Sequence, residues 1–344
     1  MGTMSTPLKP VLDILQPILQ SLAPVAPRSV PIERALGLAL AEPVCAVAPV
    51  PMRAVALRSG LAVTSLDLVG ASAQSPVMLT RAPPPVAAGD ELPDGCDAVV
   101  DPAIVIQTGS ILLVADQATP GMNAKLSGQD LRPDALVMPA GSRITLEAVL
   151  ACRLSGIDTA KVRRPTLSVQ IEEQSHETWL CGRLTALGCK LVEHGNPADV
   201  VIRSARQAEP RLALQPGDSS WVEVLSDGSV RIEVPRRFDG LIAAYLAFVV
   251  PVVAELSAQR ICAIKRPLAR KIASAIGMTE LVLLRNSDGK LNPMAIVDVT
   301  LVALAQSDAY YLVPAGVEGH AVGEVIRAVR LEDPFGFSHQ EHSS

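Results

Sequence analysis

Two adjacent glutamates form the first candidate site in this sequence. Glu172 and Glu173 follow the strand-like run 166–171, and His176 and Glu177 come shortly after them. Carboxylates bind hard cations, and the carboxyl ends of strands are where open α/β sheets bind ligands, so this segment is a candidate metal site. The alternative interpretation is a polar loop in which a glutamate caps the N-terminus of the next helix.

Two adjacent arginines, Arg236 and Arg237, form the second candidate site. A guanidinium group presents a fork of N–H donors that matches phosphate. These arginines precede a long apolar run, and the N-terminus of a helix there would also favour negative charge. We therefore expect any anionic ligand to bind beside them, between the α/β unit and the last β-rich unit. The alternative interpretation is a solvated loop with two positive charges.

The third candidate is the polar loop that contains Lys125, Gln129 and Asp130, for which ligand binding and an ordinary surface turn are equally compatible. Other site types find little support. The six cysteines include no Cys-x-x-Cys pair, which argues against a zinc site and favours small thiols in a reducing compartment. The histidines show no metal-ligand spacing, and no serine, histidine and aspartate form a nucleophile motif. We therefore assign no catalytic residue.

Composition excludes several classes of protein. A chain of 344 residues can form two or more domains. Its net charge of −5 and its aromatic content of 3% argue against binding to nucleic acid. The N-terminus has no basic segment followed by an apolar one, as a secretory signal would. The apolar run 241–256 contains Tyr245, Pro251 and Glu255, and we expect it to be too short and too interrupted to span a bilayer. These features predict a cytoplasmic protein with no membrane partner.

Periodicity divides the chain into units of different type. The run 8–23 has apolar residues at helical spacing, with Pro17 expected to kink or divide the helix, and 32–40 is expected to form a second short helix. Residues 51–139 contain prolines and glycines at short intervals, which suits a small barrel-like β domain. From Pro165 onward, strands alternate with helices, which predicts a parallel α/β sheet. The segment 223–234 is expected to form a hairpin.

The order of short motifs resembles the molybdopterin molybdotransferase family (MoeA and the gephyrin E domain). Residues 92–100 are similar to the family's LPxGADAVV, residues 120–130 to PGxNVRxxGED, and residues 151–165 to LASxGxxxVxVxRRP. Residues 269–274 and 314–319 are similar to the ARKIAS and PEGVEG segments of the family's last domain. No single motif is specific, but all occur in the family's order and at matching spacing.

The resemblance and the periodicity together predict an elongated, multi-domain α/β plus β protein of MoeA type. We expect a connecting domain (27–50 and 140–164), an inserted β-rich domain (51–139), a shortened molybdopterin-binding-type α/β domain (8–26 and 165–258), a C-terminal β domain (262–332) and a disordered tail (333–344). The family's packing implies a homodimer.

The residues that the family's chemistry needs are largely replaced. The resemblance implies insertion of molybdate into molybdopterin with release of AMP, which requires Mg²⁺-binding carboxylates and glycine-rich phosphate loops. The family's FDNSAMDGYAV aligns with 53–63, where Ala54 and Ser59 stand at its aspartate positions. Its STGDEL turn aligns with a glycine-free segment that contains Glu173, and its SGGxSxGxxD loop has no counterpart. In its GLPGNPVSA loop, Arg236 and Arg237 replace the glycine and asparagine.

We therefore expect a catalytically inactive MoeA-like protein, a pseudoenzyme that binds molybdopterin or a molybdoenzyme and assists in molybdenum cofactor handling. Molybdopterin is the implied cofactor, and Mg²⁺ is not expected. One alternative is an active molybdopterin molybdotransferase with divergent site residues that acts on a related nucleotide or pterin. Another is a non-catalytic assembly subunit of a different cofactor or enzyme complex. Partners would be a second copy of the chain and a molybdoenzyme or cofactor-biosynthesis protein.

Overall fold

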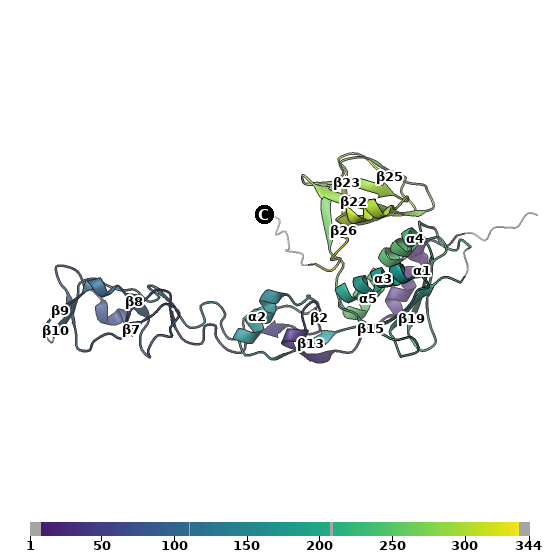
Figure 1. Cartoon of the computed structure of the whole chain (residues 1–344). Coiled ribbons are helices and arrows are strands. Elements are labelled where there is room, and N and C mark those ends of the chain that lie inside the picture. The colour runs from purple at the N-terminus through teal and green to yellow at the C-terminus, as the bar shows by residue number, and fades with distance from the viewer. Residues whose placement is uncertain (1–7, 110, 207–208, 337–344) are drawn as a thin grey trace, which may run out of the picture.

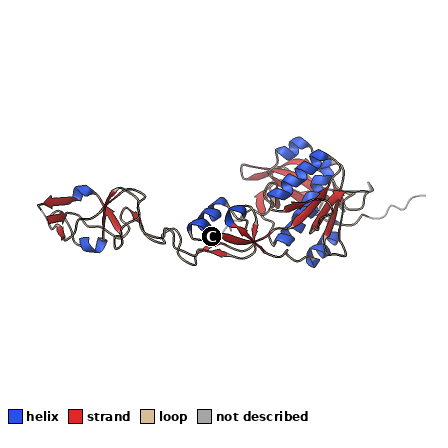
Figure 2. Cartoon of the chain, turned by 60° about the horizontal axis from the view of Figure 1, so that its bottom comes forward, coloured by secondary structure: helices blue, strands red, loops and turns tan. Residues whose placement is uncertain are grey.

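The structure is a computed structural model that describes residues 8–109, 111–206 and 209–336. The molecule is elongated, as the sequence predicts (Figure 1). The inserted β-rich domain lies at one end and the connecting domain in the middle. The α/β domain and the C-terminal β domain lie together at the other end, as Figure 2 also shows.

The connecting domain is a small antiparallel assembly with one helix. Its strands are β1 (Arg28–Pro31), β2 (Ala39–Leu40), β3 (Val44–Cys45), β12 (Leu136–Met138) and β13 (Thr159–Arg163), in the pairings β1-β13-β2 and β12-β3. Helix α2 (Leu146–Leu154) begins at Thr145, whose hydroxyl accepts from the Ala148 amide, and its end is followed by Gly156 at a φ of +82°. Such a capped start and a left-handed glycine are ordinary helix boundaries.

The expected helix over 32–40 is wrong. Only the 3₁₀ turn η1 (Ile32–Arg34) forms, and Gly37 then adopts a φ of +74°. The amide of Gly37 donates to the Ile144 carbonyl, and the amide of Leu40 donates to the Ser142 carbonyl. Pairing with the distant segment 142–144 therefore outweighs a helix propensity that Gly37 already weakens.

The inserted domain is β-rich, and its strands form three small sheets. These are β7-β5-β8, β6-β10-β9 and β11-β4, built from β4 (Val55–Ala56), β5 (Gly60–Val63), β6 (Val77–Leu79), β7 (Pro85–Val86), β8 (Ala98–Val100), β9 (Val105–Thr108), β10 (Ile111–Val114) and β11 (Ala124–Lys125), with the 3₁₀ turns η2 (Ser65–Leu68) and η3 (Pro102–Ile104). The predicted turn before β8 is present, because the amide of Cys96 donates to the Pro93 carbonyl and Gly95 has a φ of +85°. Two small apolar clusters support the domain.

The α/β domain contains the predicted parallel sheet and the predicted hairpin. The strand order is β15-β14-β16-β19-β18, with β14 (Thr166–Gln170), β15 (Lys190–Val192), β16 (Val200–Ser204) and β19 (Val230–Val234) parallel and the hairpin partner β18 (Trp221–Val224) antiparallel. Helix α1 (Val11–Ser21) continues through Pro17, which lies on its exposed side, and α3 (Gln174–Ala186) follows β14.

One continuous helix crosses the core of the α/β domain. It comprises α4 (Phe238–Ala244), the π-helical turn η4 (Tyr245–Val249) and α5 (Val250–Ser257). Pro251 lies in the first turn of α5, directly after the π turn, where a missing N–H is easily tolerated. By length and composition this helix could cross a membrane, so our expectation of a short, interrupted run is wrong. Its most apolar stretch is 89% buried inside the protein, as in the core helix of a soluble domain.

The C-terminal domain shares a sheet and a core with the α/β domain. Its main strands are β20 (Ala263–Pro267), β22 (Thr279–Ser287), β23 (Lys290–Ile296), β24 (Ala309–Val313) and β26 (Val325–Arg330), with the small pair β21 (Ile272–Ala273) and β25 (Gly319–His320) and the short helix α6 (Leu301–Ala305). The strand β17 (Leu214–Gln215) comes from the α/β portion of the sequence and pairs in parallel with β22. A single apolar cluster spans both domains, which fixes their relative position.

Arg143 connects three parts of the chain. Its guanidinium group donates to the Gly37 carbonyl at 3.1 Å, to the Ala186 carbonyl at the end of α3, and to the Asp333 carboxylate at 2.8 Å. Phe335, two residues after Asp333, is buried in the apolar cluster of the α/β and C-terminal domains. Residues 333–336 of the expected disordered tail are therefore packed against the protein, while 337–344 lie outside the described residues.

Candidate functional site

A cavity of about 570 Å³ lies at the carboxyl edge of the parallel sheet. The segments that follow β16, β17 and β19 line it together with the first turn of α4, and Val297 of the C-terminal domain completes the wall. The lining residues are Ala205, Arg206, Gln215, Pro216, Gly217, Asp218, Ser219, Pro235, Arg236, Arg237, Asp239, Gly240 and Val297. We refer to this cavity as the arginine pocket. It lies at the sheet edge where open α/β sheets bind ligands.

Two glycines allow the loops of the arginine pocket to pack closely. A Cβ on Gly240 would lie 2.8 Å from Pro235, a separation that real side chains do not show. Gly217 has a φ of +123°, and a Cβ there would lie 3.0 Å from the Leu214 side chain. Glycine is therefore required at both positions, and it brings backbone rather than side chain to the edge of the cavity.

Val297 adopts a backbone conformation that β-branched residues rarely occupy. Its φ is +62°, in the left-handed region. The amide of Val297 donates to the Leu281 carbonyl at 3.0 Å, and its carbonyl accepts from Val299 at 2.9 Å. Such a conformation costs on the order of 1–3 kcal/mol and persists where the surroundings enforce it, often at ligand sites. Sequence inspection could not find this feature, because a valine gives no signal for a positive φ.

Arg236, which lines the pocket, makes an exposed ion pair with Glu172. Its Nη2 atom lies 3.0 Å from Oε1 of Glu172, and the two side chains are 65% and 63% exposed. The pair joins the loop between β19 and α4 to the loop between β14 and α3. It therefore brings together one residue from each of the first two sequence-predicted candidates.

Arg237 is instead bound to a buried carboxylate. It makes a two-atom contact with Asp239, whose side chain is only 11% exposed and also accepts from the Gly240 amide at 2.8 Å. The hydrogen bond to Asp239 and the negative charge of that carboxylate raise the pKa of the Arg237 guanidinium. Arg237 is thus the counter-ion of Asp239, so the two neighbouring arginines differ in role.

The predicted metal-binding pair does not converge on one point. Glu173 caps α3, because its Oε2 atom accepts from the amides of Ser175 and His176 at 2.8 and 3.0 Å. The hydrogen bond from the Ser175 hydroxyl is the main reason that the pKa of Glu173 is lowered. Glu172 is directed to Arg236. Within residues 8–109, 111–206 and 209–336, no group of three or more metal-ligating side chains is close enough to hold an ion.

The loop that contains Lys125, Gln129 and Asp130 is stabilised by its own side chains. Lys125 Nζ lies 2.8 Å from the Asp130 carboxylate, and the Gln129 side chain accepts from the Leu126 amide at 2.9 Å. These contacts are those of a surface turn. Lys125 also borders a mainly apolar cavity of about 720 Å³, which involves Met52 and is distinct from the arginine pocket.

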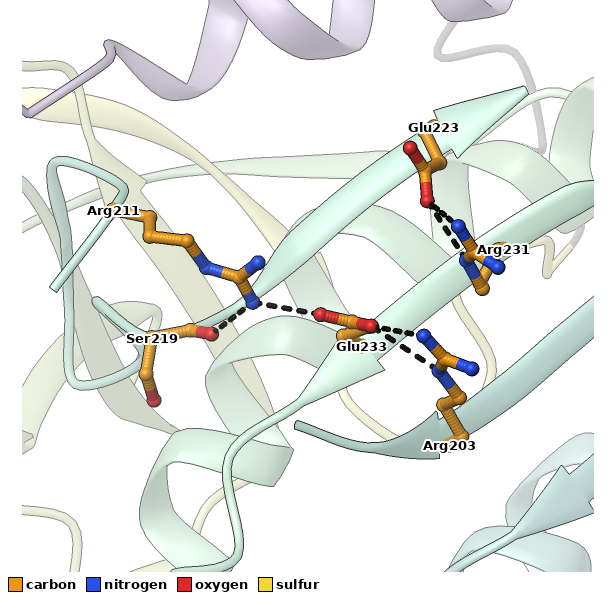
Figure 3. A network of polar contacts seen from close by, with 6 residues as sticks. All are labelled: Arg203, Arg211, Ser219, Glu223, Arg231 and Glu233. Carbon is orange, nitrogen blue, oxygen red and sulfur yellow. Dashed lines mark hydrogen bonds and ion pairs between the residues drawn. The ribbon is translucent and has the colours of Figure 1, made fainter. Parts of the chain in front are cut away.

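A buried polar network supports the wall of the arginine pocket (Figure 3). Glu233 of β19 accepts from Arg203 at 3.1 Å and from Arg211 at 2.8 Å, and its side chain is 9% exposed. Arg211 also donates to the carbonyl of Ser219, a pocket residue, at 2.9 Å. Burial raises the pKa of Glu233, but the hydrogen bonds from Arg203 and Arg211 outweigh this and leave the pKa lowered. Sequence analysis missed this network.

Fold and site together define a multi-domain protein with an inserted β arm, a short parallel sheet and a charged pocket at the carboxyl edge of that sheet. Residues 9–155 match the family model described as the MoeA N-terminal region (domain I and II). No curated protein sequence matches the chain.

Solved structures of MoeA proteins have the same fold over nearly the whole chain. Two molybdopterin biosynthesis MoeA structures from Pyrococcus horikoshii match at TM-scores of 0.69 and 0.72, with 18% and 20% identity. Each alignment covers 93% of this chain, and it covers 99% of the first MoeA chain and 98% of the second. A molybdenum cofactor biosynthesis protein from Pyrococcus furiosus matches at 0.58 with 15% identity, covering 93% of this chain and 98% of its own. The protein is therefore MoeA-like in its N-terminal region and in its overall fold.

Proposed function

We propose that this protein is a catalytically inactive MoeA-like protein that assists in molybdenum cofactor handling in the cytoplasm by binding a phosphate-bearing ligand, such as molybdopterin, in the arginine pocket. The observation that carries the proposal is the position of Arg236. It lies in a cavity of about 570 Å³ at the carboxyl edge of the sheet, directly before the long helix. The client would be a molybdoenzyme or another cofactor-biosynthesis protein.

The groups of the pocket suit an anion of this kind. Arg206 and Arg236 add positive charge to the cavity wall, while the charge of Asp239 is already neutralised by Arg237. The N-terminal end of a 20-residue helix also favours negative charge. Asp218 acts in the opposite direction, so the pocket is moderately rather than strongly cationic.

Inactivity is supported by what stands at the two positions where the resemblance places aspartates and in the turn where it places a glycine. Ala54 has no ionisable atom. The Ser59 hydroxyl accepts from the Ala88 amide at 3.2 Å and so serves a local loop contact. Glu173 is bound to the N-terminus of α3. Neither Ala54 nor Ser59 offers a carboxylate for Mg²⁺, and one oxygen of the Glu173 carboxylate is engaged by the start of α3.

Binding of AMP by the isolated chain tests the proposed site. We expect calorimetry to detect AMP and molybdopterin binding to the wild type, and a weaker interaction with the Arg236→Ala, Arg237→Ala double variant. Because Arg237 balances buried Asp239, circular dichroism must show that the double variant is folded. Unchanged affinity in a folded double variant would contradict the site, as would failure of the wild type to bind either ligand.

We also propose that the chain is a homodimer. The long helix is buried within the chain, so the interface must use another surface. Leu146, Leu150 and Leu154 are exposed along one side of α2, at the i, i+4 spacing of a continuous helix face. An exposed apolar stripe of this kind is typical of a contact with a second copy. Light scattering at micromolar concentration should give twice the 36.1 kDa mass of the chain. The variant Leu150→Glu should give the mass of a monomer, because it places a charge in the proposed contact. A monomer mass for the wild type would contradict the proposal.

A further inference from the structure

The two arginines of the pocket differ in how easily they can exchange partners. Arg237 is itself 81% exposed, but it balances a carboxylate that is only 11% exposed, and releasing that carboxylate would leave its buried charge uncompensated. Arg236 and Glu172 are both largely exposed, and exposed pairs contribute only about 0–1 kcal/mol. Arg236 can therefore release Glu172 at little cost, whereas Arg237 cannot release Asp239.

The backbone around Glu172 is held independently of its side chain. The amide of Glu172 donates to the Ser204 hydroxyl at 3.3 Å, and the next residue, Glu173, is bound to the start of α3. The Glu172 side chain can therefore rotate into solvent without movement of the loop. No rearrangement of the fold is needed to free Arg236.

We propose that Glu172 is an internal competitor that occupies Arg236 until a phosphate group displaces it, and that this competition makes the arginine pocket selective for phosphate monoesters. The inference rests on the proposed function and assigns its specificity to one pair of residues. A phosphate monoester carries a charge of about −1.5 to −2 at pH 7 and three acceptor oxygens. A carboxylate on a ligand carries the same single negative charge as Glu172. Replacing Glu172 at Arg236 would therefore add little to the binding free energy of such a ligand.

Three variants of the full chain test the competition, with AMP as the probe and adenosine as the ligand without phosphate. Glu172→Gln should bind AMP about two- to fivefold more tightly than the wild type, because it removes the competing charge. Arg236→Gln should bind AMP about tenfold more weakly, because it removes a charge-assisted contact. In the double variant Glu172→Gln, Arg236→Gln, the gain from removing Glu172 should disappear.

The matched control is Glu42→Gln. Glu42 pairs with Lys161 at 2.9 Å in the connecting domain, and the two side chains are 55% and 56% exposed. The Glu42–Lys161 ion pair is thus similar in length and exposure to the Glu172–Arg236 pair and lies in another domain, away from the pocket. Its removal should leave AMP affinity unchanged, which separates competition at Arg236 from the loss of one negative charge anywhere on the protein.

The outcomes distinguish the competition from the site itself. If the wild type binds AMP but Glu172→Gln binds no more tightly, the internal competitor is excluded and the proposed pocket stands. The same conclusion follows if the double variant binds AMP more tightly than Arg236→Gln alone. Glu172 would then act by repelling the negative charge of AMP, without competing for Arg236. If neither the wild type nor Glu172→Gln binds AMP, both the competitor and the proposed site are wrong. If adenosine bound the wild type as tightly as AMP does, phosphate would be excluded as the recognised group.

Discussion

A bacterial strain without its molybdotransferase is expected to remain without molybdoenzyme activity when this chain is expressed in it. The resemblance implies that transfer of molybdate with release of AMP uses carboxylates that hold Mg²⁺. Ala54 and Ser59 stand where the resemblance places two of these groups, and Glu173 is bound to the N-terminus of α3. Several carboxylate positions are affected together. We therefore expect no molybdotransferase activity at all, rather than a reduced activity relative to an active transferase.

The control for this experiment is the same strain with an active MoeA, together with a measurement of the soluble amount of each protein. Soluble expression without activity would agree with the prediction. Molybdoenzyme activity above the empty-vector background would refute the proposed inactivity and support the alternative of an active transferase with divergent residues. In that case, AMP bound in the arginine pocket would occupy a substrate site of an active enzyme, and not a site that only binds a ligand.

Replacement of Glu233 by alanine is expected to lower the free energy of unfolding by about 3–5 kcal/mol. The substitution leaves two partly buried guanidinium groups, those of Arg203 and Arg211, without their shared carboxylate. The matched control is Glu223→Ala on the adjacent strand. Glu223 pairs with Arg231, but both side chains are about one-third exposed, so its loss should cost about 1 kcal/mol or less. Urea unfolding followed by circular dichroism measures both, and equal effects would contradict the assigned importance of Glu233.

The pH dependence of stability gives a second test of Glu233. Its pKa in the folded protein is lowered from the ordinary value of 4.5, because the two arginines outweigh burial. A carboxylate of this kind contributes stability above its unfolded pKa, and the contribution is lost as the pH falls through the folded pKa. The wild type should therefore lose stability below about pH 4.5 more steeply than Glu233→Gln. If the free energy of unfolding changed with pH in the same way for the wild type and Glu233→Gln, the proposed contribution of the Glu233 carboxylate would be excluded.

Local patterns predicted the elements of the fold better than the contacts between them. The parallel sheet, the 223–234 hairpin and the cap at Glu173 follow from short-range periodicity, turn residues and the polar start of α3. The 3₁₀ turn at Ile32–Arg34 and the capture of β17 by β22 depend on distant partners, which no local pattern encodes. The same limit applies to the pocket. Arg236 and Glu172 were both candidates, but a separation of 64 residues hid their pairing.

The hydrogen bonds of Arg143 have a mechanical consequence for the whole molecule. The connecting and inserted domains extend away from the α/β domain as a long arm (Figure 2). The hydrogen bonds from Arg143 to Ala186 and Asp333 hold the base of this arm to the α/β domain and to the segment after β26. A small rotation at the base becomes a wide arc at the tip, where β9 and β10 lie (Figure 1). The same rotation would displace the arginine pocket far less, because the pocket lies in the α/β domain next to the base of the arm.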